Sequence, residues 1–365
     1  MDQIDEIKKS GLFDEAWYLK TYPDIKTNPI EHYLTFGANE RRNPSRHFNT
    51  AYYLSRYQDV AKSGMNPLVH FIRHGKQEGR IPSSKQLSII IPHKDATKSL
   101  SVLLKSIKEA EDFIEVYVVD DHSKPIEVAR FEQLKKTYPD YHYLTSEGSF
   151  AGIARNTALK QVTTQWVLFA DADDYFLPGW YDEVSKYLGS KNEIVFFPPT
   201  SKNLQTGKLG KRHLGYENLV HSYVKNPAQF DGELRLNMHP PWSKLLRMEL
   251  LRRHGLEFGS EEVSNDKVFS LKASFWADPI ASSPIAIYCV TEGTNTLTTT
   301  NTLERLKVRA EVLRQSNEFL KENYGRQPLP QYDCRHLYDK AIEEGFSESE
   351  IDQLLAYIHR LGLKV

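Results

Sequence analysis

The sequence is poor in cysteine, in long apolar runs and in excess charge of either sign. Its 365 residues include only Cys289 and Cys334, too few and too far apart for a disulfide scaffold or a cysteine-based zinc site, which favours a reducing compartment. No apolar run approaches the length of about 18 residues that a membrane-spanning helix requires. The formal net charge of −1 provides no general attraction for nucleic acid.

The first residues, MDQIDEIKKSGLFDE, are charged and lack the apolar core of an export signal. With 40% hydrophobic and 26% charged residues, the composition is ordinary for a globular protein. The length suggests two domains, or one large domain with appendages. We therefore expect a cytoplasmic protein.

The first part of the chain contains an internal repeat. Residues 13–44 and 48–82 share Phe, Tyr-Leu, Tyr, Asp, Asn-Pro, His, Gly, Glu, Arg and Pro in the same order. Each copy predicts a short helix, a turn, a second helix that begins at Asn-Pro and a glycine stop. The repeated His32 and His70 could suggest a metal site, but no carboxylate or cysteine lies at ligand spacing, and a structural role is favoured. We expect a helical domain over residues 1–85.

The middle of the chain alternates apolar, β-branched runs with helical patterns, which is typical of a mostly parallel sheet covered by helices. Acidic residues follow three of these runs: Asp95 after the first, Asp120 and Asp121 after the second, and Asp171 and Asp173 after WVLFA. The carboxyl ends of parallel strands meet at one edge of the sheet, so these acids are expected to converge. A divalent cation would neutralise them, and oxygen ligands suit Mg²⁺ or Mn²⁺.

Three other interpretations of this pattern are weaker. A D-x-D sequence by itself occurs often by chance in a surface turn. VVDDHS alone is similar to the acidic pocket of a phosphoryl receiver domain, but here it follows a complete strand–helix unit. A nucleotidyl transferase would need a glycine-rich phosphate loop after the first strand, and HKDATKS contains no glycine.

Four segments in order, LSIIIPHKD, IEVYVVDDHS, SFAGIARNTAL and WVLFADADDYFLPGW, resemble the inverting family 2 glycosyltransferases, which have the GT-A fold. The resemblance spans residues 86–295, and it implies a catalytic domain over 86–300. It also implies a nucleotide-sugar donor, with UDP as the expected nucleotide, a Mn²⁺ or Mg²⁺ cofactor and a glycan or lipid-linked glycan acceptor. The N-terminal repeats are similar to short repeats attached to glycosyltransferases that build bacterial polysaccharides.

The resemblance also implies roles in donor binding. Pro92 and Asp95 match a loop that borders the nucleobase, and Asp120 matches an acid that accepts hydrogen bonds from the uracil or its ribose. Arg155 matches a basic residue near the ribose and phosphates. The loop departs from the family pattern at His93, where an aromatic residue is usual, which weakens the inference about the base.

The D-x-D acids would hold the metal and part of the donor. Asp171 matches the acid that touches the ribose or a metal-bound water, and Asp173 matches the metal ligand that bridges to the diphosphate. For Asp174 we expect a position one step removed from the metal; the alternative is an acid in the first turn of the following helix, where the helix dipole would favour it.

Inverting transfer requires a base on the acceptor side, and the resemblance assigns that role to Asp266, which opens an amphipathic segment. Two alternatives are that Asp266 is merely a helix cap, and that Glu261 or Glu262 is the base. The segment before it contains Trp242, a candidate sugar platform.

The same segment contains Lys244, a candidate contact for the diphosphate or the acceptor, and His239, a weaker candidate for a metal or phosphate contact. Structural roles for Trp242 and Lys244 are equally compatible with the sequence. Residues 292–299 resemble a loop that closes near the donor.

The tail, residues 301–365, predicts amphipathic helices. Its cations could face an anionic membrane surface, giving peripheral attachment, although helices packed on the catalytic domain are favoured; these cations are Arg305, Lys307, Arg309 and Arg314. We thus expect a hexosyl- or N-acetylhexosaminyltransferase of bacterial surface-polysaccharide synthesis. The competing hypothesis is a non-catalytic carbohydrate-binding or scaffold protein with the same fold.

Overall fold

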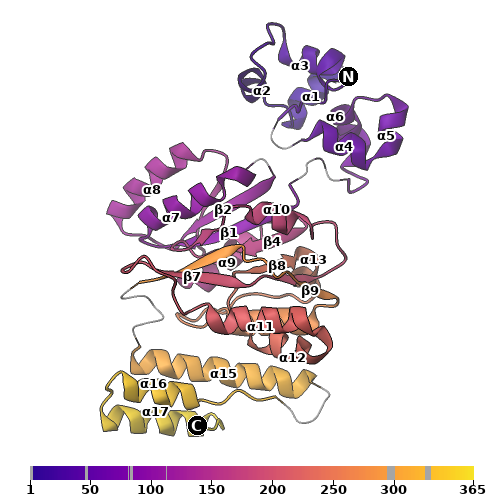
Figure 1. Cartoon of the computed structure of the whole chain (residues 1–365). Coiled ribbons are helices and arrows are strands. Elements are labelled where there is room, and N and C mark those ends of the chain that lie inside the picture. Colours follow the sequence, from indigo (N-terminus) through magenta and orange to yellow (C-terminus); the bar gives the residue numbers. More distant parts are fainter. Residues whose placement is uncertain are drawn as a thin grey trace. The chain divides into compact units, whose positions relative to one another are not determined.

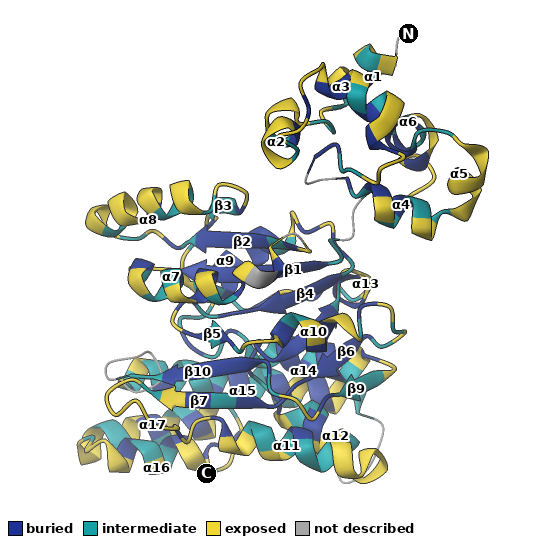
Figure 2. Cartoon of the chain, turned by 45° about the horizontal axis from the view of Figure 1, so that its top comes forward, coloured by how far each residue is buried: buried dark blue, intermediate teal, exposed yellow. Residues whose placement is uncertain are grey.

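The computed structural model divides the chain into two compact units, Met1–Gln86 and Leu87–Val365 (Figure 1). The structure describes residues 3–45, 48–80, 82, 85–111, 113–293, 301–324 and 330–365. Each unit has a buried core of its own, formed in the first by helices and in the second mainly by strands (Figure 2).

The first unit repeats one helical arrangement twice. Its first copy contains α2 and α3, the latter continuing into the π-helical turn η1, and its second copy contains α4, α5 and α6, the last continuing into η2. Asn28 and Asn66 begin the matched helices, because each side chain accepts two backbone N–H groups of the first turn. The bounds are α1 Gln3–Ser10, α2 Glu15–Thr21, α3 Pro29–His32, η1 Tyr33–Gly37, α4 Thr50–Arg56, α5 Gln58–Ser63, α6 Pro67–His70 and η2 Phe71–Gly75.

Each of the two repeated histidines lies at hydrogen-bond distance from a tyrosine hydroxyl. Nδ1 of His32 lies 3.0 Å from the hydroxyl of Tyr18, and Nδ1 of His70 lies 3.0 Å from that of Tyr53. These tyrosines are completely buried, so each histidine satisfies a hydroxyl that would otherwise lack a partner. The structure thus favours the structural interpretation of this histidine pair over a metal site.

In the described part of the second unit, the main sheet has the strand order β3-β2-β1-β4-β8-β6-β9. β1 lies between β2 and β4 and is parallel to both, whereas β8 is antiparallel to its neighbours β4 and β6. A smaller sheet, β5-β10-β7, lies beside it. The bounds are β1 Leu87–His93, β2 Ile114–Asp120, β3 His142–Thr145, β4 Trp166–Phe169, β5 Tyr175–Phe176, β6 Ile194–Phe196, β7 Pro199–Asn203, β8 Lys244–Arg247, β9 Ile280–Ser282 and β10 Tyr288–Glu292.

These strands confirm the predicted mostly parallel α/β sheet, and the continuous apolar run of β1 is buried along its whole length. The helix α9 packs against β1, β2 and β3, α13 packs against β8, and α12 packs against α14. The bounds are α7 Thr97–Ser106, η3 Lys108–Ala110, α8 Pro125–Thr137, α9 Phe150–Leu159, α10 Trp180–Ser185, α11 Leu214–Lys225, α12 Pro227–Asn237, α13 Met248–Arg253 and α14 Lys267–Trp276.

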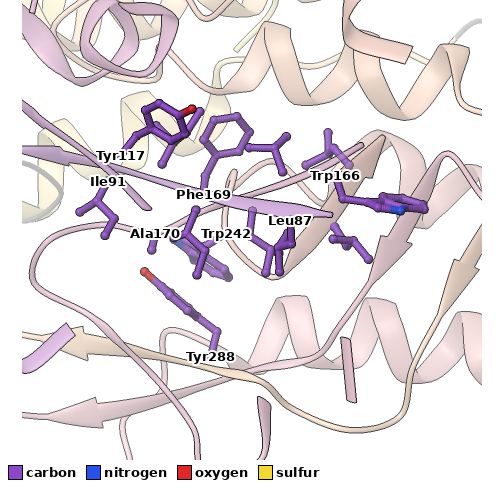
Figure 3. Close-up of a cluster of buried hydrophobic side chains, with 14 of the residues drawn as sticks. Leu87, Ile91, Tyr117, Trp166, Phe169, Ala170, Trp242 and Tyr288 are labelled. Carbon is purple, nitrogen blue, oxygen red and sulfur yellow. The ribbon is translucent and has the colours of Figure 1, made fainter. Parts of the chain in front are cut away.

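The core of the second unit is rich in large aromatic side chains. Trp166 and Phe169 of β4 lie near Leu87 and Ile91 of β1 in Figure 3. Toward the smaller sheet, the ring of Trp242 stacks on that of Tyr288, with centroids 5.8 Å apart. This stack joins the segment before β8 to β10, and so connects the two sheets.

The tail forms α15 (Leu303–Asn323), α16 (Arg335–Glu343) and α17 (Glu348–Arg360). α15 packs against α14, where Phe319 and Leu320 cluster with Leu271. Arg305 of α15 bonds Glu262 at 2.6 Å, and Lys307 bonds Glu304 at 2.7 Å. The structure therefore favours tail helices packed on the α/β part of the second unit over a tail free to lie on a membrane. No helix in the described ranges is both long and apolar enough to cross a bilayer.

Candidate active site

A cavity of about 860 Å³ opens beyond the carboxyl ends of β1 and β4. Pro92 and His93 from the end of β1 line one side, and residues 171–174 after β4 line the floor. The start of α14 and the facing sides of α15 and α16 line the opposite wall. Of the residues assigned to donor binding, the metal or catalysis, the structure brings five to this cavity: Pro92, Arg155, Asp171, Asp173 and Asp266. The candidate sugar platform Trp242 and the weaker candidate His239 also line it.

Arg155 connects the two halves of the cavity. Its Nη2 donates to Oδ1 of Asp171 at 2.6 Å, and its Nη1 donates to Oδ1 of Asn265 at 3.2 Å. Arg155 is only 5% exposed, so the guanidinium of this ion pair is shielded from water. The pair therefore fixes the loop after β4 relative to the residue that precedes Asp266.

The three acids after β4 have different environments. Asp174 is buried and accepts hydrogen bonds from the Tyr288 hydroxyl at 2.9 Å and the Thr291 amide at 2.7 Å. Burial, reinforced by the neighbouring Asp173 and Asp171, raises the pKa of Asp174 well above its ordinary value. The alternative that Asp174 lies in the first turn of a helix is wrong, because α10 begins at Trp180.

Asp173 is the most exposed of these acids, and it faces the cavity. The surrounding cavity walls nevertheless desolvate its carboxylate, and this desolvation together with the charge of Asp171 raises the pKa of Asp173. Thr291 anchors this turn, since its hydroxyl donates to the Asp173 carbonyl at 2.8 Å. Residues 294–299 of the predicted closing loop lie outside the described residues.

Asp171 and Asp173 supply two carboxylates on one turn, and no cluster of three or more His, Cys, Asp or Glu able to hold a metal occurs among the described residues. Mg²⁺ is commonly held by one or two protein carboxylates together with substrate phosphates and waters. The two oxygen donors therefore fit a cation that binds together with a phosphorylated ligand, rather than one held in a full protein cage.

Asp266 directly precedes α14, but its carboxylate does not cap the helix. Its backbone is already helical, and its side chain lines the cavity. Burial raises its pKa, with a further contribution from Asp171 and opposition from Arg155 and Lys244. Of the alternatives, Glu262 is occupied by its ion pair with Arg305, and Glu261 does not line the cavity. Asp266 thus occupies the N-cap position of α14 without a cap hydrogen bond from its side chain, which argues against a role as a helix cap alone.

Two predicted nucleotide contacts lie outside the cavity wall. Asp95 accepts the Lys124 amide at 2.7 Å, and its own amide donates to Ser123 at 2.8 Å, so it joins the loops after β1 and β2. Asp120 Oδ1 is buried without a hydrogen-bond partner among the described residues, and Nε2 of His93 lies 3.9 Å from it. Asp121 lines the cavity in their place.

Lys244 does not line the cavity. Its side chain is fully buried, and its Nζ donates to the Met238 carbonyl at 2.6 Å. Burial lowers the pKa of Lys244 to about 7. Trp242 does line the cavity, but it is only 2% exposed, since Tyr288 stacks on its ring and Tyr216 meets it edge-on at 5.6 Å. The burial favours a structural role for Lys244 and leaves Trp242 little surface for a sugar.

Sequence reasoning missed several residues that line the cavity. Arg212 and Tyr216 lie near the start of α11, while Arg309 and His336 come from the tail helices α15 and α16. From the sequence, Arg309 is expected to be a membrane contact or a solvated charge on a packed helix. No local pattern in the sequence indicated that the tail would complete this wall.

Residues 88–254 match the family model for Glycosyl transferase family 2. This stretch is a family 2 glycosyltransferase domain. The family 2 domain contains Arg155 and the acids after β4, while Asp266, α15 and α16 lie beyond the matched residues. Part of the cavity wall is thus built outside the segment that carries the family pattern.

The relatives of the family 2 domain include the putative glycosyltransferase EpsH of Bacillus subtilis, 22% identical over 209 residues, which are 55% of this chain and 59% of EpsH. The poly(ribitol-phosphate) beta-glucosyltransferase of Bacillus spizizenii is 26% identical over 210 residues, 54% of this chain and 31% of that protein. The chain thus spans less than two thirds of the length of these relatives.

The crystal structure of residues 1–349 of TarS from Staphylococcus aureus, in complex with UDP-GlcNAc, shares the fold. The TM-score is 0.57 at 18% identity, over 76% of this chain and 80% of the TarS chain. The likeness confirms the predicted GT-A fold for the α/β part of the chain.

Proposed function

We propose that this protein is a metal-dependent inverting glycosyltransferase that moves a sugar from a UDP-sugar to a hydroxyl of a glycan acceptor. The proposal depends chiefly on one observation. The carboxylate of Asp266 does not cap its helix and faces the same cavity as Asp171 and Asp173. A base and a pair of diphosphate-side acids in one cavity are what direct displacement requires.

In this proposal the acceptor hydroxyl oxygen attacks the anomeric carbon as the bond from that carbon to the donor diphosphate breaks. Asp266 takes the hydroxyl proton, and its raised pKa makes the carboxylate a better proton acceptor than an ordinary aspartate. The diphosphate leaves from the opposite face, so the configuration at the anomeric carbon inverts.

Asp171 and Asp173 would hold the Mn²⁺ or Mg²⁺ ion, which supplies positive charge for the leaving diphosphate when bound. Arg155 fixes the Asp171 carboxylate through its 2.6 Å ion pair. Pro92 and Asp121 line the end of the cavity near β1 and β2, where the nucleoside would bind. The complex of TarS with UDP-GlcNAc and its name as a poly(ribitol-phosphate) beta-N-acetylglucosaminyltransferase support a UDP-sugar donor and a polymeric acceptor.

The first experiment is calorimetric binding of UDP-, GDP- and dTDP-sugars to the full chain, with Mn²⁺ present and then chelated. We expect one UDP-sugar to bind with metal, and Asp173→Ala to weaken that binding at least tenfold. Asp352→Ala, which removes an exposed carboxylate of α17 away from the cavity, serves as the matched control.

Absence of binding by every nucleotide, with and without metal, would overturn the proposal and favour the non-catalytic scaffold. Binding without transfer to any glycan would favour the same alternative, provided that UDP release is also absent. Metal-independent binding that Asp173→Ala leaves unchanged would refute the assignment of the metal to these acids.

A further inference from the structure

One wall of the cavity carries cations that form no ion pair with an acid in the described part of the chain. Lys267 opens α14, Arg309 lies on α15, and His239 and His336 lie beside them. The hydrogen-bonding neighbours of the two strong cations are neutral. Nζ of Lys267 lies 2.7 Å from Nε2 of His239, and Nη1 of Arg309 donates to the Ser264 hydroxyl at 3.1 Å.

The other cations of α15 provide a contrast. Arg305 pairs with Glu262, Lys307 with Glu304 and Arg314 with Glu311. Arg309 lies on the same helix but faces the cavity, and it lacks such a partner within the described chain. Lys307 and Arg314, the outer cations of α15, thus pair with acids of the same helix, and Arg305 pairs with Glu262 of the segment before α14. Arg309 has no paired acid among the described residues.

Burial makes these charges costly without a ligand. Burial lowers the pKa of Lys267 to about 8, and it also lowers the pKa of Arg309. Burial is likewise the main cause that lowers the pKa of His239, and Lys267 and Lys244 add to it. Nδ1 of His239 is buried without a hydrogen-bond partner among the described residues. A buried polar atom such as Nδ1 of His239 is usually satisfied by a ligand or a water, and partly buried cations such as Lys267 and Arg309 usually have a counter-ion.

The position of the cluster relates it to the acceptor rather than to the donor. Lys267 directly follows Asp266, and the charge of Asp266 acts on both Lys267 and Arg309. In an inverting displacement, the base and the leaving diphosphate lie on opposite faces of the anomeric carbon. Cations grouped around the base therefore face the incoming hydroxyl, whereas the diphosphate belongs with Asp171 and Asp173.

We infer that the wall formed by Lys267, Arg309, His239 and His336 binds a phosphate group carried by the acceptor close to its reacting hydroxyl. This inference rests on the proposed function, since it assumes that Asp266 marks the acceptor side. A phosphate offers several oxygens and up to two negative charges to the ammonium, guanidinium and imidazole groups present here. The protein would then select phosphate-bearing glycans or polyol phosphates over neutral ones.

The test is calorimetric titration of inorganic phosphate into the full chain saturated with UDP and Mg²⁺, so that the donor site is already filled. We expect phosphate to bind this complex, and Arg309→Gln and Lys267→Met each to weaken phosphate binding at least tenfold. UDP affinity should change less than twofold in both variants. Lys307→Gln, which removes an outer cation of the same helix, should change neither affinity.

A transfer assay provides a second measurement. With a matched pair of acceptors, one neutral and one phosphorylated, the two substitutions should raise KM for the phosphorylated acceptor about tenfold and leave KM for the donor unchanged. Thermal unfolding of each variant shows whether the fold is retained.

Three outcomes would overturn the inference: no phosphate binding to the UDP complex, equal binding by the variants, or displacement of phosphate by UDP. The last would assign the cations to the donor diphosphate. Failure of the wild-type chain to bind UDP is a separate result, and it would refute the proposed function. Phosphate can also be titrated into the chain without nucleotide, and that result would not change this conclusion.

Discussion

The guanidinium of Arg155 lies 2.6 Å from the carboxylate of Asp171, in an ion pair whose arginine is buried. The second nitrogen of the same guanidinium holds Asn265, the residue before Asp266. One side chain thus sets the distance between the proposed metal-binding turn and the proposed base.

Replacement of Arg155 by lysine should lower kcat/KM for transfer by roughly 100-fold, because an ammonium group cannot reach Asp171 and Asn265 together with the planar geometry of arginine. The steady-state rate of UDP release measures this. Arg130→Lys, at an exposed position on α8, is the control. An Arg155→Lys variant with unchanged kcat/KM would show that the coupling between the two loops is not needed.

Replacement of Asp266 by asparagine should lower kcat by roughly 10²- to 10⁴-fold and leave donor affinity unchanged, because the base acts on the acceptor. Burial raises the pKa of Asp266, so the acid limb of the wild-type pH–rate profile should lie above the ordinary aspartate pKa of about 4. The pH–rate profile of the residual activity of Asp266→Asn should lack this acid limb.

The raised pKa of Asp266 also predicts the sign of a stability change. The folded protein holds the Asp266 proton more tightly than the unfolded chain, so ionisation of this group costs stability as pH rises above its unfolded pKa. Thermal unfolding at pH 7 should therefore show an Asp266→Asn melting temperature equal to or higher than that of the wild type. A clear decrease would indicate that the carboxylate has a structural partner.

Replacement of Tyr288 by phenylalanine should destabilise the second unit by about 1–3 kcal/mol, because two buried groups lose a partner. The hydroxyl donates to Asp174 at 2.9 Å and accepts the Asp171 amide at 2.8 Å. Denaturant unfolding measures the change, and metal-dependent UDP binding should weaken with it. Tyr338→Phe, on α16, is the control and should be neutral.

Replacement of Lys244 by methionine tests whether this lysine contacts the diphosphate. We expect UDP affinity to change less than twofold, because Nζ bonds the Met238 carbonyl and does not reach the cavity. Burial lowers the pKa of Lys244 to about 7, so wild-type stability should increase as pH rises from about 7 toward the ordinary lysine value. The Lys244→Met variant should lose that part of the pH dependence.

In the first unit, replacement of Gly37 by alanine should be destabilising by about 1–3 kcal/mol, because the new Cβ would lie 2.3 Å from the hydroxyl of Tyr18. Tyr18→Phe removes that hydroxyl, so the double variant should be more stable than the sum of the two single changes implies. Additive effects in this double-mutant cycle would contradict the proposed clash. Gly75 and Tyr53 form the matching pair in the second repeat, also at 2.3 Å.

Local sequence patterns determined much of the architecture. Continuous apolar runs predicted β1, β2 and β4, since both faces of a parallel sheet are covered, and the Asn-Pro and glycine signals predicted α3 and α6. The acids after β4 were found for the same reason: their position at a strand end can be read from the chain without knowledge of its folding. The roles of these acids remain proposals.

The tertiary structure decided which of these side chains meet. Successive side chains at the end of a strand point to opposite sides, so Asp121 faces the cavity while Asp120 lies against His93. The sequence cannot show which of these two adjacent aspartates faces the cavity. Lys244 is buried because β8 lies inside the sheet between β4 and β6, and the strand order cannot be read from the sequence. Arg309 reaches the cavity only because α15 packs on α14, a pairing between distant segments that depends on apolar surface and leaves no local signal in the sequence.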